Sequence, residues 1–134
     1  MSNGIRISGF GINVDDLDRA AEFYTGALGL QEKAKYDLGE MHEVLVGGEH
    51  DTSAILLVKH SKRTEKPEPG NGFEKIALVT DDVNGAYERS LAQGGSSVSE
   101  PRTLEMGIRM ALVRDPDGYL IELIEPWADP PALR

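Results

Sequence analysis

The chain has 134 residues, a formal net charge of −9 at pH 7 and no cysteine. Its length fits one domain or two small modules, and 40% hydrophobic with 28% charged residues is ordinary for a soluble globular protein. The acidic balance argues against nucleic acid or an anionic membrane as a partner. The lack of cysteine excludes disulfides and thiolate ligands. Because there is neither a long apolar run nor a signal pattern, we expect a cytoplasmic protein.

The first half of the chain predicts a strand, a helix and three more strands. Apolar residues alternate over residues 5–14, as in a half-buried strand. Asp15 and Asp16 then offer N-caps for a helix whose apolar residues recur at helical spacing, and Gly29 can end it. The three strands are expected near residues 32–36, 41–46 and 54–58, with Gly47 and Gly48 marking the last turn.

The second half repeats this order after a polar, proline-containing linker at residues 59–72. A turn signal, Asp-Pro-Asp-Gly, occupies residues 115–118. Residues 126–134 are rich in proline and predict an irregular tail. The strands and the helix are expected at residues 73–80, 83–91, 97–100, 108–113 and 119–124.

An internal repeat supports two modules. Sliding the chain by 66 residues lays Asp15 on Asp81 and Ile55 on Ile121, without a gap. We therefore predict an α+β fold in which two βαβββ modules, residues 5–58 and 73–125, form one domain that spans residues 1–134.

Two segments resemble the vicinal oxygen chelate superfamily, the group that includes glyoxalase I, bleomycin-resistance proteins and extradiol dioxygenases. VDDLDRAAEFYTGALGL, residues 14–30, is similar to its first helix, and RDPDGYLIELIE, residues 114–125, is similar to its last hairpin. The resemblance implies curved mixed sheets around a cup-shaped pocket, a small-molecule ligand and a homodimer.

Strand alternation predicts which side chains line the cup. If large aliphatic residues face the helices, Glu122 and Lys75 point into the cup from the second module. In the third strand of that module we expect Met110 and Leu112 to face the helix, which leaves Arg109 and Ala111 in the cup. The repeat pairs Arg109 with Glu43 of the first module. The candidate catalytic residues are Glu122, Lys75, Arg109 and Glu43, and the candidate substrate-binding residues are Asn13, Met41, Leu45, Leu56, Val58, Ala77, Ala111 and Leu120.

The resemblance also implies where a metal would bind. The four ligand positions of metal-dependent relatives fall on Gly9, Leu56, Lys75 and Glu122, of which only Glu122 is an ordinary ligand. We therefore expect no cofactor. A divalent metal would need a non-standard ligand set, such as His42 or His50 together with Glu122.

Three functions remain open. One is a metal-independent isomerase or lyase that acts on a small polar carbonyl or carboxylate metabolite through Glu122 and Lys75. Another is a non-catalytic protein that binds a drug or a metabolite, although an aromatic content of 6% offers few residues for stacking. The third is a metal-dependent lactoylglutathione lyase or dioxygenase with altered ligands. It is equally open that Lys75 only neutralises a leftover carboxylate.

Overall fold

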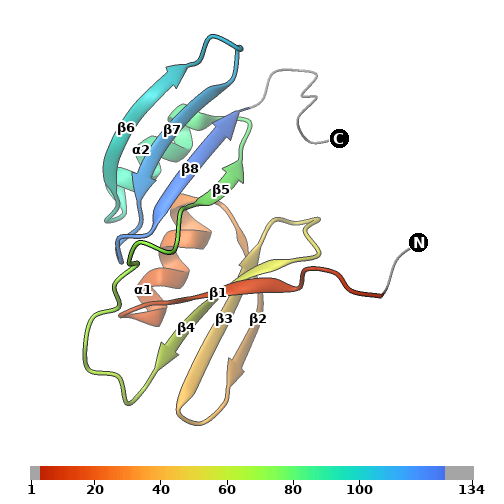
Figure 1. Ribbon diagram of the computed structural model, residues 1–134, viewed down its shortest axis with the longest axis vertical. Helices are drawn as coiled ribbons and strands as arrows, with labels where there is room; N and C mark the ends of the chain where they lie inside the picture. Colours follow the sequence, from red (N-terminus) through yellow and green to blue (C-terminus); the bar gives the residue numbers. More distant parts are fainter. Residues whose placement is uncertain (1–3, 126–134) are drawn as a thin grey trace. The chain divides into compact units, whose positions relative to one another are not determined.

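The computed structural model describes residues 4–125, so the predicted tail at residues 126–134 lies outside the described part. The chain divides between Pro67 and Glu68 into two compact units, and the boundary falls within the predicted linker. Each unit has one four-stranded mixed sheet with a helix on one face (Figure 1).

Unit 1 has the strand order β1-β4-β3-β2. Strands β1 and β4 are parallel, whereas β3 is antiparallel to both β4 and β2. The elements are β1 (Gly9–Asn13), α1 (Leu17–Glu22), η1 (Phe23–Ala27), β2 (Gln31–Asp37), β3 (Met41–Gly47) and β4 (Ala54–His60).

The first helix changes its winding before it ends. Asp16 caps α1 by accepting a hydrogen bond from the backbone N–H of Arg19 at 3.0 Å. The chain then continues as the π-helix η1, in which the N–H of Leu28 donates to the carbonyl of Phe23 at 3.2 Å. Gly29, at a φ of 75°, turns the chain away, as expected for a glycine after a helix.

Unit 2 repeats the architecture with the strand order β5-β8-β7-β6. Asp82 caps its helix through the N–H of Gly85 at 3.0 Å. The elements are β5 (Ile76–Val79), α2 (Val83–Ala92), β6 (Ser96–Thr103), β7 (Arg109–Arg114) and β8 (Leu120–Glu125). The predicted α+β fold of two βαβββ modules is confirmed.

Each unit has its own hydrophobic core between its sheet and its helix. In unit 1 the strands contribute Ile12, Val44, Val46, Ile55 and Leu57, all buried. In unit 2 they contribute Ile76, Ala111, Val113, Ile121 and Leu123. The other face of each sheet is more exposed to solvent, and we call it the open face.

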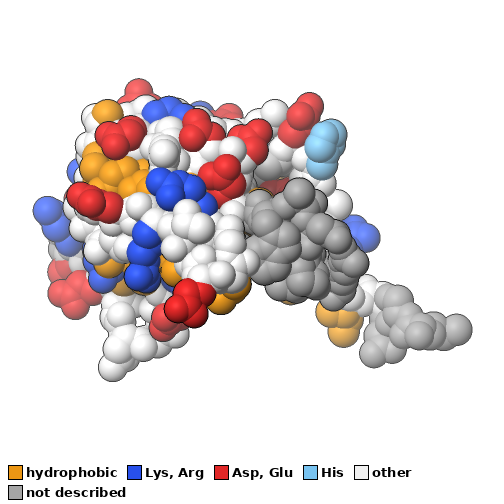
Figure 2. All heavy atoms as spheres, turned by 90° about the horizontal axis from the view of Figure 1, so that it is seen from above, with side chains coloured by type: hydrophobic (Ala, Val, Ile, Leu, Met, Phe, Trp, Pro, Cys, Tyr) orange, Lys and Arg blue, Asp and Glu red, His pale blue; other side chains and the backbone are white. Residues whose placement is uncertain are grey.

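Acidic and basic side chains are interspersed on the surface that Figure 2 displays. Within residues 4–125, no helix has the length and apolarity needed to cross a membrane.

Candidate functional site

The open face of the unit 2 sheet carries an ion pair. Lys75, just before β5, places its Nζ 3.1 Å from Oε2 of Glu122 in β8. Glu122 is 17% exposed and Lys75 37%, so the carboxylate is the more enclosed partner. Ala77 and Leu112 lie beside Glu122 on the two neighbouring strands. A half-buried carboxylate among small and aliphatic residues, with an ammonium in contact, can bind a polar ligand or transfer a proton.

The turn before β8 fixes the position of Glu122. Asp115 is buried, and its Oδ1 accepts hydrogen bonds from the N–H groups of Asp117 and Tyr119, both at 2.9 Å. These bonds close the predicted turn and start β8, in which Ile121 and Leu123 pack against the core. Glu122 therefore points to the opposite, open face.

The predicted orientation of β7 is wrong. Glu122 pairs with Leu112, and Ile124 pairs with Met110, so Leu112 and Met110 share the open face with Glu122. Arg109 and Ala111 alternate with them and lie on the helix face. Ala111 is fully buried there, which removes it from the candidate substrate-binding residues.

Arg109 binds the start of α2. Its Nε and Nη2 donate to Oδ1 of Asn84 at 3.2 and 2.8 Å, and its Nη1 donates to Oγ1 of Thr103 at 3.1 Å. This network ties α2 to β6 and β7. The hydrogen bonds described for Arg109 therefore connect elements of unit 2 and do not include Lys75 or Glu122.

We expect Arg109→Lys to lower the free energy of unfolding by about 0.5–1 kcal/mol, because an ammonium cannot reproduce the forked donation to Asn84. Denaturant unfolding measures this loss. Ligand turnover or affinity should stay at the wild-type level, since the side chain lies on the helix face. A loss of turnover without a loss of stability would indicate that Arg109 is part of the functional site after all.

The open face of unit 1 holds the predicted site residues of the first module. Leu120, the last predicted residue, lies instead in β8 on the same side as Glu122. Register puts Leu45 and Gly11 beside Leu56, and Asn13 and Glu43 beside Val58. Met41 shares this parity at the start of β3. Leu56 is the counterpart of Glu122, so the equivalent position in unit 1 is apolar.

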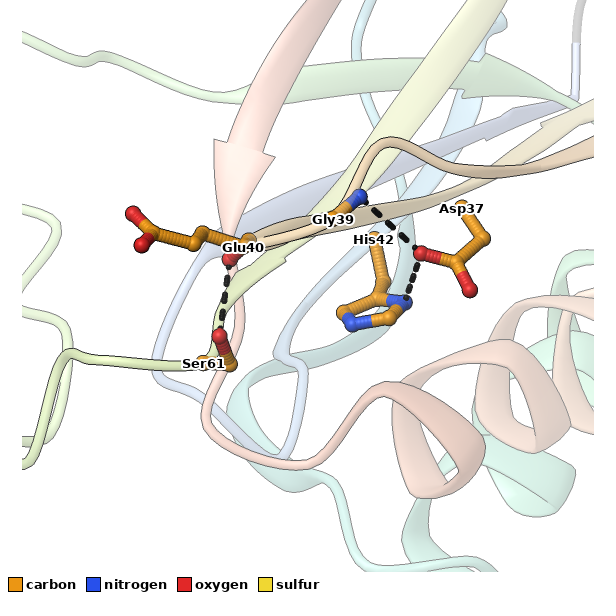
Figure 3. A network of polar contacts seen from close by, with 5 residues as sticks. All are labelled: Asp37, Gly39, Glu40, His42 and Ser61. Carbon is orange, nitrogen blue, oxygen red and sulfur yellow. Dashed lines mark hydrogen bonds and ion pairs between the residues drawn. The ribbon is translucent and has the colours of Figure 1, made fainter.

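Glu43 also lines a cleft of about 340 Å³ between the start of α1 and the β2–β3 hairpin. In Figure 3, Oδ1 of Asp37 accepts from the N–H of Gly39 at 3.1 Å and lies 3.4 Å from Nδ1 of His42. Register alternation puts His42 on the helix face. Of the four predicted catalytic residues, the described contacts join only Lys75 to Glu122.

Residues 6–123 match the Glyoxalase/Bleomycin resistance protein/Dioxygenase superfamily. The chain belongs to this superfamily. The match includes the first motif and all but the last two residues of the second, and it agrees with the two-module fold.

Similar proteins within the superfamily are lactoylglutathione lyases. The chain is 38% identical over 118 residues to a probable lactoylglutathione lyase of Synechocystis, covering 85% of this chain and 90% of that protein. It is 35% identical over 118 residues to a lactoylglutathione lyase of Neisseria meningitidis serogroup A, covering 85% and 86%. Glyoxalase I from Zea mays has a TM-score of 0.78 at 30% identity over 90% of this chain and 47% of the maize chain, so this chain spans about half the maize protein.

The residues at the family's metal positions do not fit a divalent ion. Gly9 has no side chain, and a Cβ built there would overlap the carbonyl oxygen of Ala54 and lie 2.7 Å from Cδ1 of Leu56. Leu56 has no donor atom, and Lys75 presents an ammonium to Glu122. Among the described residues, no group of three or more histidine and carboxylate side chains is arranged to hold a metal.

Two residues of the unit 2 open face were missed by the sequence reasoning. Met110 is buried and Leu112 is half-buried, and both lie in β7, next to the strand of Glu122. Their large apolar side chains were expected against the helix. The length of the connection between the last two strands, compared between the modules, is the signal that could have identified them.

Proposed function

We propose that the chain is an isomerase or lyase of the glyoxalase type that acts on a small carbonyl or carboxylate compound, with Glu122 as the proton-transferring group and Lys75 as the group that binds the substrate oxygen. The observation that carries this proposal is the 3.1 Å contact between Lys75 and the enclosed Glu122 carboxylate. Similarity to lactoylglutathione lyases supports the reaction class.

Glu122 and Lys75 together provide the two groups that the proposed reaction needs. Glu122 as a carboxylate can remove a proton from carbon next to a carbonyl, and the resulting oxyanion needs a positive partner. The Lys75 ammonium is that partner, and Leu112 and Ile124 add half-buried aliphatic side chains to the same face.

A second candidate is a metal-dependent lactoylglutathione lyase. The 38% identity to the Synechocystis protein over 90% of its length favours it. Against it stand Gly9 and Leu56, which provide no ligand, and the positive charge of Lys75.

Both candidates are tested with the purified wild-type chain. It is incubated with lactoylglutathione and, separately, with a panel of 2-oxo and 2-hydroxy acids, and products are identified by mass spectrometry alongside elemental analysis. We expect turnover without stoichiometric metal. Turnover that is lost with a chelator and regained with nickel or zinc would favour the second candidate. A tightly retained ligand without product would instead identify a binding protein.

We also propose a homodimer, as the resemblance implies. Sedimentation velocity on the same sample should give a mass about twice the 14.6 kDa of one chain. A single species at 14.6 kDa would contradict it.

A further inference from the structure

The positive charge at the unit 2 face comes from the chain itself. Within the described residues, Lys75 is the ion-pair partner of Glu122, and their side-chain atoms meet at 3.1 Å. A divalent ion bound by Glu122 would lie roughly 2 Å from its oxygen, and so would sit against the ammonium. Two cations cannot share this carboxylate at such a separation without strong repulsion.

We infer that the Lys75 ammonium is the resident cation of this face in place of a divalent metal, and that it binds one oxygen of a small carboxylate ligand. This inference rests on the proposed function for the location of the site. It goes further in naming the cation and the ligand class.

The ligand class follows from the chemistry of the ammonium and its surroundings. An ammonium has three N–H donors, and the contact with Glu122 uses one direction. With 37% of its side chain exposed, Lys75 can direct its other donors to a ligand. A lysine ammonium is a compact charge suited to a carboxylate oxygen.

The apolar part of the ligand would lie on β5. Ala77 is small and exposed, and Val79 is 60% exposed on the same face. These two residues form a shallow aliphatic surface beside the ion pair. A short-chain 2-hydroxy or 2-oxo acid has both features, a carboxylate for Lys75 and a small aliphatic tail for Val79.

The test replaces the cation. Nickel binding is measured by equilibrium dialysis and elemental analysis for the wild type, Lys75→His, and Lys75→His combined with Glu122→Gln. We expect no nickel site in the wild type. Lys75→His should gain roughly tenfold or more in nickel affinity, because imidazole and carboxylate are both metal ligands. The double variant should lose that gain.

A matched control uses the exposed pair of Lys62 and Glu40, which meet at 2.7 Å with exposures of 79% and 70%. Lys62→His should gain far less nickel affinity than Lys75→His, since the side chains at positions 62 and 40 are exposed and are therefore held less firmly. Equal gains would show that any histidine beside a glutamate suffices, and would overturn the inference. Stoichiometric nickel in the wild type that disappears in Glu122→Gln would also overturn it.

The ligand class is tested with L-lactate and pyruvate as probes, by NMR titration. Lys75→Met, which keeps an unbranched chain only one atom shorter and removes the charge, should weaken binding by roughly tenfold or more. Unchanged affinity would contradict the role of Lys75. Neither readout requires turnover, so an inactive protein that gains nickel in Lys75→His would refute the proposed function and leave this inference standing.

Discussion

Glu122→Gln is expected to reduce turnover by roughly 10²- to 10⁴-fold, the usual contribution of a general acid or base. The amide has nearly the same shape as the carboxylate, so the face keeps its packing, but it cannot accept the proton. The half-exposed position of Lys75 limits the loss of folding free energy to about 1 kcal/mol or less. The measurement is kcat/KM on the substrate found with the wild type, together with denaturant unfolding.

Glu40→Gln is the matched control. Glu40 also pairs with a lysine, Lys62, at 2.7 Å, but this pair is exposed, with Glu40 in the β2–β3 turn and Lys62 after β4. We expect its kcat/KM to equal that of the wild type. If Glu122→Gln retained full activity while folded, Glu122 would be only the counter-ion of Lys75 and the proposed mechanism would fail.

The sequence was sufficient to predict the elements because local signals agreed with the fold. Alternating apolar residues, Asp16 and Asp82 as caps, and the turn at Asp115 all coincide with observed boundaries. The π-helix after α1 was not predicted, since residues 23–27 have the same apolar spacing whether the winding is α or π.

The contact between Lys75 and Glu122 was predictable because the first and last strands of both modules are related by the same offset of 66 residues. Gly11 pairs with Leu56 in unit 1, and Ala77 pairs with Glu122 in unit 2, at the same spacing of 66 residues. Parallel pairing of the first and last strands therefore fixes which face each position occupies.

The orientation of β7 was not predictable from that offset. Val46 pairs with Ile55 across residues 47–54, whereas Val113 pairs with Ile121 across residues 114–120. The second connection is one residue shorter, and a shift of one residue moves every side chain of a strand to the other face. Residue size also gave the wrong orientation for β7. The large residues were expected on the helix face, but it is the smaller Ala111 that lies there, where α2 packs against β7.

Gly9→Ala is expected to lower the free energy of unfolding by about 2 kcal/mol or more, the upper range for forcing an atom into a packed position. A Cβ at this position would overlap the carbonyl oxygen of Ala54, in the strand paired with β1. The obstacle is backbone, so it cannot rotate away as a side chain could. Separation of β1 from β4 is the relief available, and it disturbs a parallel pairing of the unit 1 sheet.

Gly11→Ala, two residues further along the same strand, should have the opposite sign. Its Cβ would meet Val58 Cγ2 at 3.6 Å and Leu56 Cβ at 3.8 Å, both ordinary contacts. The loss of unfolded-state freedom then stabilises the fold by about 0.4–1 kcal/mol. Urea unfolding of the two variants measures the difference, and equal effects would refute a close approach at Gly9. Since the backbone of β4 excludes any side chain from Gly9, a ligand cannot be regained there by a single substitution, and Lys75 remains the accessible position for changing the cation of this protein.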